Sequence, residues 1–333
     1  MTGFRYHALA LTTSVVTLAV GVVVGVGPLS QAQTTKHREQ VAALQHRQAA
    51  LTERLATAEA RAGDDRSLAE ALAGPLTAGR LKARTVVVVA APGADPALVR
   101  RTVADLKAAG ATVTGTLSLT NVYVDPGKAQ SPLEDLVLRL VPPGVEFTDG
   151  ASAIDRVGTV LARSTVSAAD PTPAAVDQKA AEVIAGLHEL GALKLRGAPG
   201  RLAGLAVVVA GPAAHGTAAV TGAQDALLGL VAALDKGSRG VVVIGSPDSA
   251  RPHRLIAQVR TSPLTRNPST VDTGGSVGGD LALVLSLAEQ AGGHAGDYGR
   301  GPGAVGLVPD TTTPDATAPD TQGSDVAGDA GTG

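Results

Sequence analysis

The longest run of apolar and uncharged residues lies near the start of the chain, from Ala8 to Gly27. At a helical rise of about 1.5 Å per residue, a run of about 20 residues crosses a hydrocarbon core about 30 Å thick. We therefore predict a single membrane-spanning anchor within residues 1–30, with the rest of the chain on one side of the membrane. The basic residues that flank the run do not decide which side this is, and we expect the extracytoplasmic one. A secretory signal peptide is the alternative, because Arg5 precedes the run as a positive flank would.

Two glycines in this run, Gly21 and Gly25, are one helical turn apart and make a GxxxG pattern. Small residues at this spacing let the backbone of a second helix approach closely. The pattern is common in membrane spans, so it gains weight only from the segment that follows.

Residues 31–68 are rich in good helix formers, and their apolar positions recur at alternating steps of three and four. The seam positions are Val41, Leu44, Gln48, Leu51, Leu55, Ala58 and Ala62. This spacing predicts a coiled coil. Together with Gly21 and Gly25 it favours a parallel homodimer, whose dimerisation residues are Gly21, Gly25, Val41, Leu44, Leu51 and Leu55. An amphipathic helix packed on its own domain is the alternative.

After the heptads, residues 63–84 are interpreted as a connector, and the pattern then changes to continuous apolar runs. Val86–Ala91 is a valine-rich run of the kind buried on both faces of a parallel sheet. Pro96–Ala109 predicts a helix with Asp95 as its N-cap, and Val113–Leu119 predicts the next strand. This order predicts a strand-helix-strand unit.

A similar pattern returns later in the chain, which predicts an α/β domain over residues 80–300, built of two such halves with a hinge near 165–175. The strands predicted for the second half are Leu205–Ala210 and Val241–Ile244. The further predicted helices are Leu133–Leu140, Ala174–Leu190, Val220–Leu234 and Asp280–Gln290. The sheet is expected to be mostly parallel, and its strand order does not follow from the pattern.

The last segment, residues 309–333, contains regularly spaced aspartates among Thr, Gly, Ala and Pro and has no basic residue. Such a segment buries too little apolar surface to offset its ordering entropy. We predict a disordered acidic tail.

Composition restricts the candidate chemistry. The chain has no cysteine and a single methionine, so thiolate sites and disulfides are excluded and the preferred ligands of Cu(I) are scarce. None of the seven histidines is followed by another at the spacing of one helix face. A site assembled from His215, His253 and His294 stays open, and the metal ligands, if any, are unknown.

Nucleic acid is an unlikely partner on charge and aromatic content. The formal net charge is -2, and the chain has only three Tyr and two Phe. Neither a basic surface nor a base-stacking platform follows from such a composition.

Three short patterns resemble catalytic or phosphate motifs but lack the context that each needs. Gly301–Gly306 follows no strand, and Gly211–Thr217 has a threonine where a P-loop has its lysine. Asp272–Gly274 spells the aspartic-protease tripeptide without a second copy in the chain. We therefore expect a protein that is not an enzyme. A small-molecule site at the carboxyl ends of the strands, near Pro92 or Pro212, is suggested by fold analogy alone.

The order of several motifs over residues 3–300 resembles the actinobacterial copper transporter family. These motifs are Arg5-His7-Ala8, the small and apolar residues 18–25, the strand VTGTLSLT at 113–120, Ser269–Asp272 and Tyr298–Gly299. The resemblance implies a cell-envelope protein that lowers intracellular copper, described for the family as a channel in the mycobacterial outer membrane.

Two functions are therefore open at this stage. The resemblance implies a role in copper export or tolerance. The residues themselves favour a non-catalytic, dimeric envelope scaffold that recruits protein partners, for instance in cell-wall remodelling or division.

Overall fold

The computed structural model describes residues 31–124, 130–169, 176–198, 200–212, 217–265 and 267–310. The predicted anchor with Gly21 and Gly25, His215, and nearly all of the predicted acidic tail lie outside these residues. The chain divides into two compact units, Met1–Ser67 and Leu68–Gly333, each of which is described by itself.

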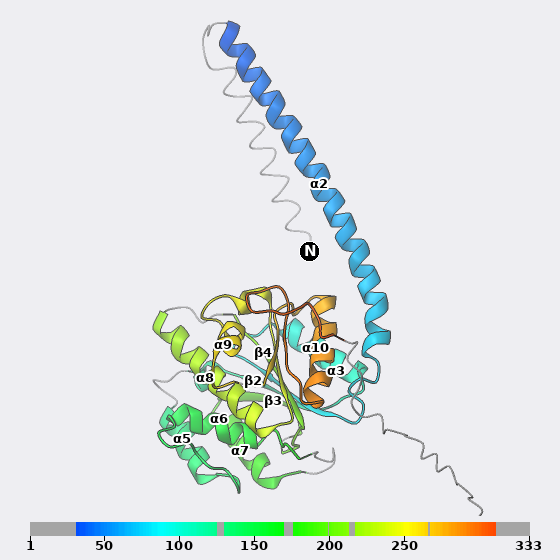
Figure 1. Ribbon diagram of the computed structural model, residues 1–333. Helices are drawn as coiled ribbons and strands as arrows, with labels where there is room; N and C mark the ends of the chain where they lie inside the picture. Colours follow the sequence, from blue (N-terminus) through cyan, green and yellow to red (C-terminus); the bar gives the residue numbers. More distant parts are fainter. Residues whose placement is uncertain are drawn as a thin grey trace, which may run out of the picture. The chain divides into compact units, whose positions relative to one another are not determined.

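The heptad segment is helical, and the helix α2 runs from Gln31 to Thr77 (Figure 1). The predicted connector at 63–84 is wrong over most of its length, since α2 continues through Gly63 and Gly74. A glycine costs a helix about 1 kcal/mol relative to alanine, a cost that the surrounding Ala, Leu, Arg and Glu residues offset. The helix ends two residues after Pro75. Among the described residues, no helix combines the length and apolar character that crossing a bilayer requires.

The second unit is built on a seven-stranded sheet in the order β3-β2-β1-β4-β5-β6-β7. All neighbouring strands are parallel except β3, which is antiparallel to β2. The strands are β1 (Thr85–Ala90), β2 (Thr112–Leu119), β3 (Leu193–Gly197), β4 (Leu205–Val209), β5 (Val241–Ile244), β6 (Ser269–Val271) and β7 (Asp297–Tyr298). The predicted α/β class with a mostly parallel sheet is confirmed.

Helices cover both faces of this sheet, as Figure 1 shows. One face packs on α3 (Pro96–Ala108) and α10 (Val277–Ala291). The helices on the other face are α4 (Asn121–Val124), α5 (Gln130–Arg139), α6 (Ala153–Arg163), α7 (Gln178–Glu189), α8 (Thr217–Gly237) and α9 (Leu255–Thr261). Because alternate residues of a strand point to opposite faces, Val86 and Val88 enter the first core while Val87 and Val89 enter the second. This explains the uninterrupted valine runs.

Local signals in the sequence set several helix boundaries. The Asp95 side chain accepts a hydrogen bond from the backbone N–H of Ala97 and caps α3, as predicted. Ser152 and Asp155 form a capping box at the start of α6, a helix that the sequence analysis did not predict. Helix α7 begins at Gln178, later than the predicted Ala174.

The strand order reverses at the centre of the sheet. The chain proceeds from β1 to β2 on one side and returns to place β4 on the other side of β1. In open α/β sheets, such a reversal leaves a crevice outside the carboxyl ends of the two strands, because their connections run in opposite directions. The structure therefore directs attention to the ends of β1 and β4.

Candidate functional site

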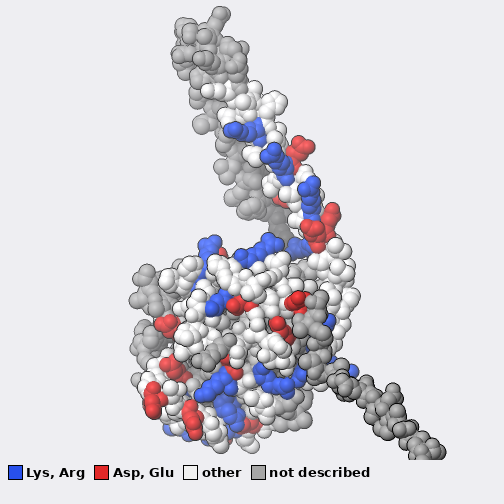
Figure 2. Space-filling view, in the orientation of Figure 1, with Lys and Arg blue, Asp and Glu red and all other residues white. Residues whose placement is uncertain are grey.

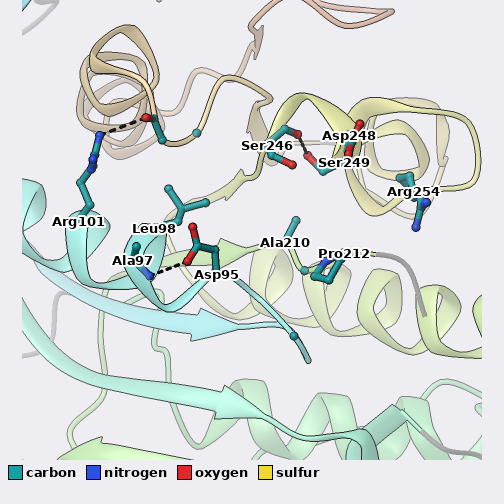
Figure 3. Close-up of a pocket in the computed structure, with 14 residues that line it drawn as sticks. Asp95, Ala97, Leu98, Arg101, Ala210, Pro212, Ser246, Asp248, Ser249 and Arg254 are labelled. Atoms are coloured by element: carbon teal, nitrogen blue, oxygen red, sulfur yellow. Dashed lines mark hydrogen bonds between the residues drawn. The ribbon is translucent and has the colours of Figure 1, made fainter. Parts of the chain in front are cut away.

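A cavity of about 410 Å³ lies at the carboxyl ends of four parallel strands, at the reversal of strand order (Figure 3). We call it the switch-point cavity. The residues that line it are Gly93, Asp95, Ala97, Leu98, Arg101, Ala210, Gly211, Pro212, Ser246, Asp248, Ser249, Arg254, Gly274 and Gly275. Its position agrees with the small-molecule site suggested near Pro212, and Pro92 adjoins its lining residue Gly93.

Glycines let the loops after the strands approach each other at the cavity. A Cβ atom on Gly211, which follows β4, would lie 2.3 Å from the carbonyl oxygen of Pro92, which follows β1. A Cβ on Gly274, after β6, would lie 2.8 Å from the carbonyl oxygen of Gly245, after β5. Side chains at these two positions would push the loops apart, so the glycines fix the shape of the cavity.

One wall of the cavity is the first two turns of α3. Asp95 accepts a hydrogen bond of 2.8 Å from the backbone N–H of Ala97, and Pro96 has no N–H to donate. Arg101, one turn further on, donates to the carbonyl oxygen of Gly275 at 3.2 Å and contacts Asp280 at 3.4 Å. The arginine thus links α3 to α10 and to the loop that precedes it.

The other wall is the segment between β5 and α9. Asp248 and Arg251 form an exposed ion pair of 3.0 Å, and the Ser249 hydroxyl donates to the carbonyl oxygen of Ser246. Arg254 is the N-cap residue of α9, and its side chain makes no capping hydrogen bond. Its Nη1 atom is buried and has no hydrogen-bond partner among the described residues.

Two carboxyl groups lie close to Arg101 at the contact between α3 and α10. Burial raises the pKa of Asp105 to about 6, and the neighbouring Asp280 adds to the shift while Arg101 opposes it. Burial also raises the pKa of Asp280, against the ion pair and hydrogen bond with Arg101. The positive charge of Arg101 therefore partly offsets the cost of burying both carboxyl groups.

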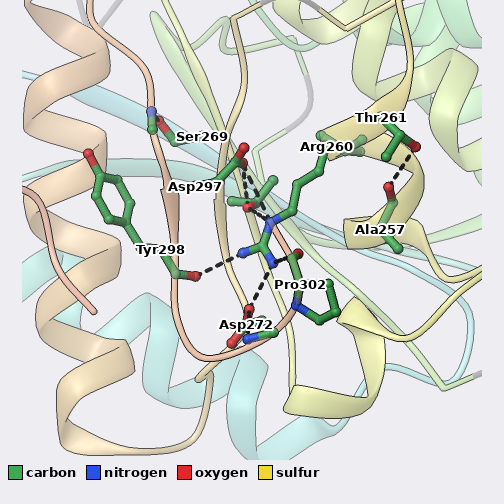
Figure 4. A network of polar contacts seen from close by, with 12 residues as sticks. Ala257, Arg260, Thr261, Ser269, Asp272, Asp297, Tyr298 and Pro302 are labelled. Carbon is green, nitrogen blue, oxygen red and sulfur yellow. Dashed lines mark hydrogen bonds and ion pairs between the residues drawn. The ribbon is translucent and has the colours of Figure 1, made fainter. Parts of the chain in front are cut away.

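A second polar network lies around Arg260 of α9 (Figure 4). Arg260 and Asp272 form a buried ion pair of 2.9 Å, with side-chain exposures of 3% and 0%. Arg260 also donates to the Thr270 hydroxyl and to the carbonyl oxygens of Tyr298 and Pro302. The arginine thereby holds the segment after β7 against the sheet.

The protease-like tripeptide at Asp272 belongs to this network. The carboxylate of Asp272 accepts hydrogen bonds from the backbone N–H groups of Arg300 and Gly301, at 2.8 and 2.9 Å. All of its described partners fix the chain, so Asp272 has a structural role. The Gly301–Gly306 segment, which matched a phosphate motif, lies in this turn. Contrary to the sequence analysis a strand does precede it, the two-residue β7, but no helix follows it among the described residues up to 310, so the helix that a phosphate motif needs is missing there.

The predicted dimerisation residues of α2 are exposed. The exposed fraction is 44% for Val41, 63% for Leu44 and 60% for both Leu51 and Leu55. Leu72 and Leu76 stand in the same alternating register, beyond a break at Asp65, which occupies a d position, and are also exposed. The sequence analysis missed them because it ended the helix too early. Figure 2 shows basic and acidic side chains spaced along the same helix.

Only two of the three histidines considered as a metal site lie in the part of the chain that the structure describes. His253 and His294 are exposed, and His215 lies outside the described ranges. No group of three or more His, Asp or Glu side chains with a metal-binding arrangement occurs among the described residues.

Comparison with known proteins gives a family match over nearly the whole chain. The family model described as "Copper transport outer membrane protein, MctB" matches residues 1–309. The proteins named copper transporter MctB from Mycobacterium tuberculosis and Mycobacterium bovis are each 30% identical over 331 residues, which covers 92% of this chain and 99% of the relative. The protein of that name from Mycobacterium leprae is 28% identical over 321 residues, with the same coverage.

Proposed function

The chain belongs to the MctB family of copper transport outer membrane proteins, and from this membership we propose that it acts in the cell envelope in copper export or tolerance. The match over residues 1–309 includes the N-terminal apolar run, the heptads and the α/β unit. The alignment with the Mycobacterium relatives likewise covers 99% of their length and 92% of this chain. The whole chain, and not an isolated domain, is therefore the unit to which we assign the role.

We propose that residues 8–27 anchor the protein in a membrane and that the α/β unit faces the extracytoplasmic side. The length of the apolar run supports a span, because about 20 residues of helix match the hydrocarbon thickness. Copper handled by this protein is cargo in this proposal. We assign it no resident site in the α/β unit.

The observation that carries the proposed assembly is the exposed seam of α2. Apolar residues at a and d positions of a 47-residue helix are exposed over its described length. Burying such a seam against a second copy removes each leucine from water, which is worth about 1.5–3 kcal/mol for full burial. A parallel homodimer satisfies the seam of both copies at once.

Crosslinking tests the homodimer. Replacing Leu44, Leu51 and Leu55 together with Asp places three charges in the seam and should abolish crosslinked dimers of the full-length chain in membranes. The matched control replaces Ala42, Ala49 and Ala56 with Asp, which puts the same charges at b positions outside the seam. Dimers that survive in the leucine variant, or that vanish equally in both, would contradict the assignment.

The copper role is tested in a deletion strain. Loss of the gene should raise copper sensitivity and cell-associated copper, and the full-length chain should restore both. The seam variant should restore copper resistance less well than its matched control if the dimer is the working form. Unchanged copper sensitivity in the deletion strain would contradict the copper role.

A dimeric envelope scaffold is the second candidate, and the continuation of the seam to Leu72 and Leu76 favours it. A helix of 47 residues spans about 70 Å, which suits a spacer or a recruiting surface better than a transport path. In this case the deletion strain should show altered cell separation at unchanged copper sensitivity. The two phenotypes distinguish the candidates in one strain.

A further inference from the structure

We propose that the switch-point cavity binds a phosphate monoester of a hydroxylated small molecule, such as a sugar phosphate or a nucleotide, with Arg254 as the phosphate ligand. The proposal is independent of copper and of the dimer, because every residue that carries it lies in the α/β unit. The cavity volume of about 410 Å³ lies in the range of about 300–1,000 Å³ that is typical of small-molecule sites.

Arg254 breaks the local rules for its position. N-cap positions favour Ser, Thr, Asp and Asn, and a positive charge near a helix N-terminus is unfavourable. The preceding residue, His253, has a φ of +63°, a left-handed conformation that is uncommon for residues other than glycine. Locally unfavourable features of this kind cluster at functional sites.

The side chain of Arg254 also has unused hydrogen-bonding capacity inside the cavity wall. Its Nη1 is buried without a partner among the described residues, and leaving a buried donor unsatisfied costs free energy. A guanidinium group presents planar N–H donors that match the oxygens of a phosphate. Arg254 lines the cavity, so an oxyanion bound there would neutralise its charge, and a shift of the side chain would bring the buried Nη1 within reach of it.

The α3 wall selects a different part of the ligand. One carboxylate oxygen of Asp95 accepts a hydrogen bond from the Ala97 N–H. A carboxylate has further acceptor positions that a ligand could use. Its negative charge and the N–H-free Pro96 disfavour a phosphate at this end of the cavity. Asp95 instead suits ligand hydroxyl groups, while Leu98 and Pro212 offer apolar contact for a carbon skeleton. Figure 3 shows Asp95 and Arg254 on separate elements of the wall.

Titration of the purified full-length chain in detergent tests the site. The probes are ribose 5-phosphate, AMP and adenosine, and their binding is measured by isothermal titration calorimetry. We expect both monoesters to bind and adenosine to bind at least about tenfold more weakly than AMP. The ratio of the two monoester affinities then separates a sugar phosphate site from a nucleotide site.

Variants assign the binding to Arg254. Arg254→Gln should weaken monoester binding at least about tenfold, and Arg254→Lys should weaken it less because the charge is kept. The control is Arg251→Gln, which removes an exposed arginine from the same segment and should leave affinity within about twofold. Melting temperatures of the ligand-free proteins show whether each variant is folded. If Arg254→Gln is unfolded, the affinity of Arg254→Lys for the monoesters is compared with that of the wild type instead.

Three results would overturn the proposal. The first is a wild-type chain that binds neither monoester. The second is adenosine bound as tightly as AMP, since the phosphate would then contribute nothing. The third is an equal loss of affinity in the Arg251 and Arg254 variants.

Discussion

At the scale of single residues, the ion pair between Arg260 and Asp272 shows how burial changes the value of a charge. Both side chains are almost fully removed from water, and the backbone N–H groups of Arg300 and Gly301 complete the shell of the carboxylate. Removing one partner of such a pair leaves an uncompensated buried charge, whereas removing both restores neutrality.

Arg260→Met should therefore lower the free energy of unfolding by about 3–5 kcal/mol, because it removes the cation that faces the buried Asp272 carboxyl group. The double variant with Asp272→Asn should be more stable than the Arg260 single variant. Chemical denaturation measures both. Arg251→Ala, at an exposed ion pair, serves as the control and should cost at most about 1 kcal/mol. Equal losses at Arg260 and Arg251 would contradict the buried pair.

The raised pKa of Asp105 determines whether the stability of the fold rises or falls with pH. Its folded-state pKa of about 6 exceeds the ordinary value of 3.8, so the folded chain holds this proton more tightly than the unfolded chain. The resulting stability is present below about pH 4 and is lost as the pH rises through about 6. Asp280, the other carboxyl group beside it, shifts in the same direction, and Arg101 is the cation that faces both.

Asp105→Asn should remove much of this loss and stabilise the protein at pH 7 by about 1 kcal/mol, a value reduced for partial exposure. The measurement is the free energy of unfolding between pH 4 and pH 7. Asp225→Asn, on the exposed side of α8, should leave the profile unchanged. A parallel shift of the whole profile in the Asp105 variant would show that its charge is not the cause.

The sequence could not have revealed these residue roles. Asp272 was noticed for its protease-like tripeptide and within the Ser269–Asp272 motif of the family resemblance. Its structural role was not foreseen, because its partner Arg260 lies on a helix that the apolar pattern did not predict. The electrostatic interaction between Asp105 and Asp280 joins helices that are far apart in the chain. Arg254 is equally invisible in the sequence, since its unusual position depends on where α9 begins.

At the scale of elements, adjacent glycines in the first turn of α10 have opposite roles. A Cβ on Gly279 would lie 2.1 Å from the carbonyl oxygen of Thr273, whereas a Cβ on Gly278 would come no closer than 3.9 Å to the Ser276 hydroxyl. Gly279 therefore lets the loop after β6 pass close to the helix. Gly278 has open space beside it and no such packing role.

Gly278→Ala should raise the free energy of unfolding by about 0.5–1 kcal/mol, because alanine is the better helix former. Gly279→Ala should instead lower it by about 2 kcal/mol or more, since backbone must move to admit the methyl group. Thermal and chemical denaturation of the two variants give the signs. Two changes of the same sign would contradict the packing at this turn.

Elements with strong signals were predicted well, and weak ones were missed. β1, β4 and β5 are buried on both faces, so their valine runs were recognisable. β3 has the sequence LKLRG and mixed exposure, and β6 and β7 have three and two residues, too few for any periodicity. The end of α2 was misplaced because glycine was treated as a break in a segment otherwise rich in helix formers.

At the scale of the whole molecule, the sequence predicted the class of the α/β unit but not the order of its strands. The order depends on β4 pairing with β1, two runs separated by more than a hundred residues and nearly identical in composition. Only the three-dimensional pairing creates the reversal between β1 and β4. The proposed ligand site therefore followed from the structure, while its approximate place near Pro212 followed from the general behaviour of parallel sheets.

The two edges of the sheet have a further consequence for how copies of the chain meet one another. β3 presents Lys194 and Arg196 at one edge, and β7 offers only two residues at the other. Charged or very short edge strands resist pairing with the strands of another molecule. We therefore expect crowded copies to resist fibre-like polymerisation through their sheets. Association between copies would then depend on the exposed side chains of α2.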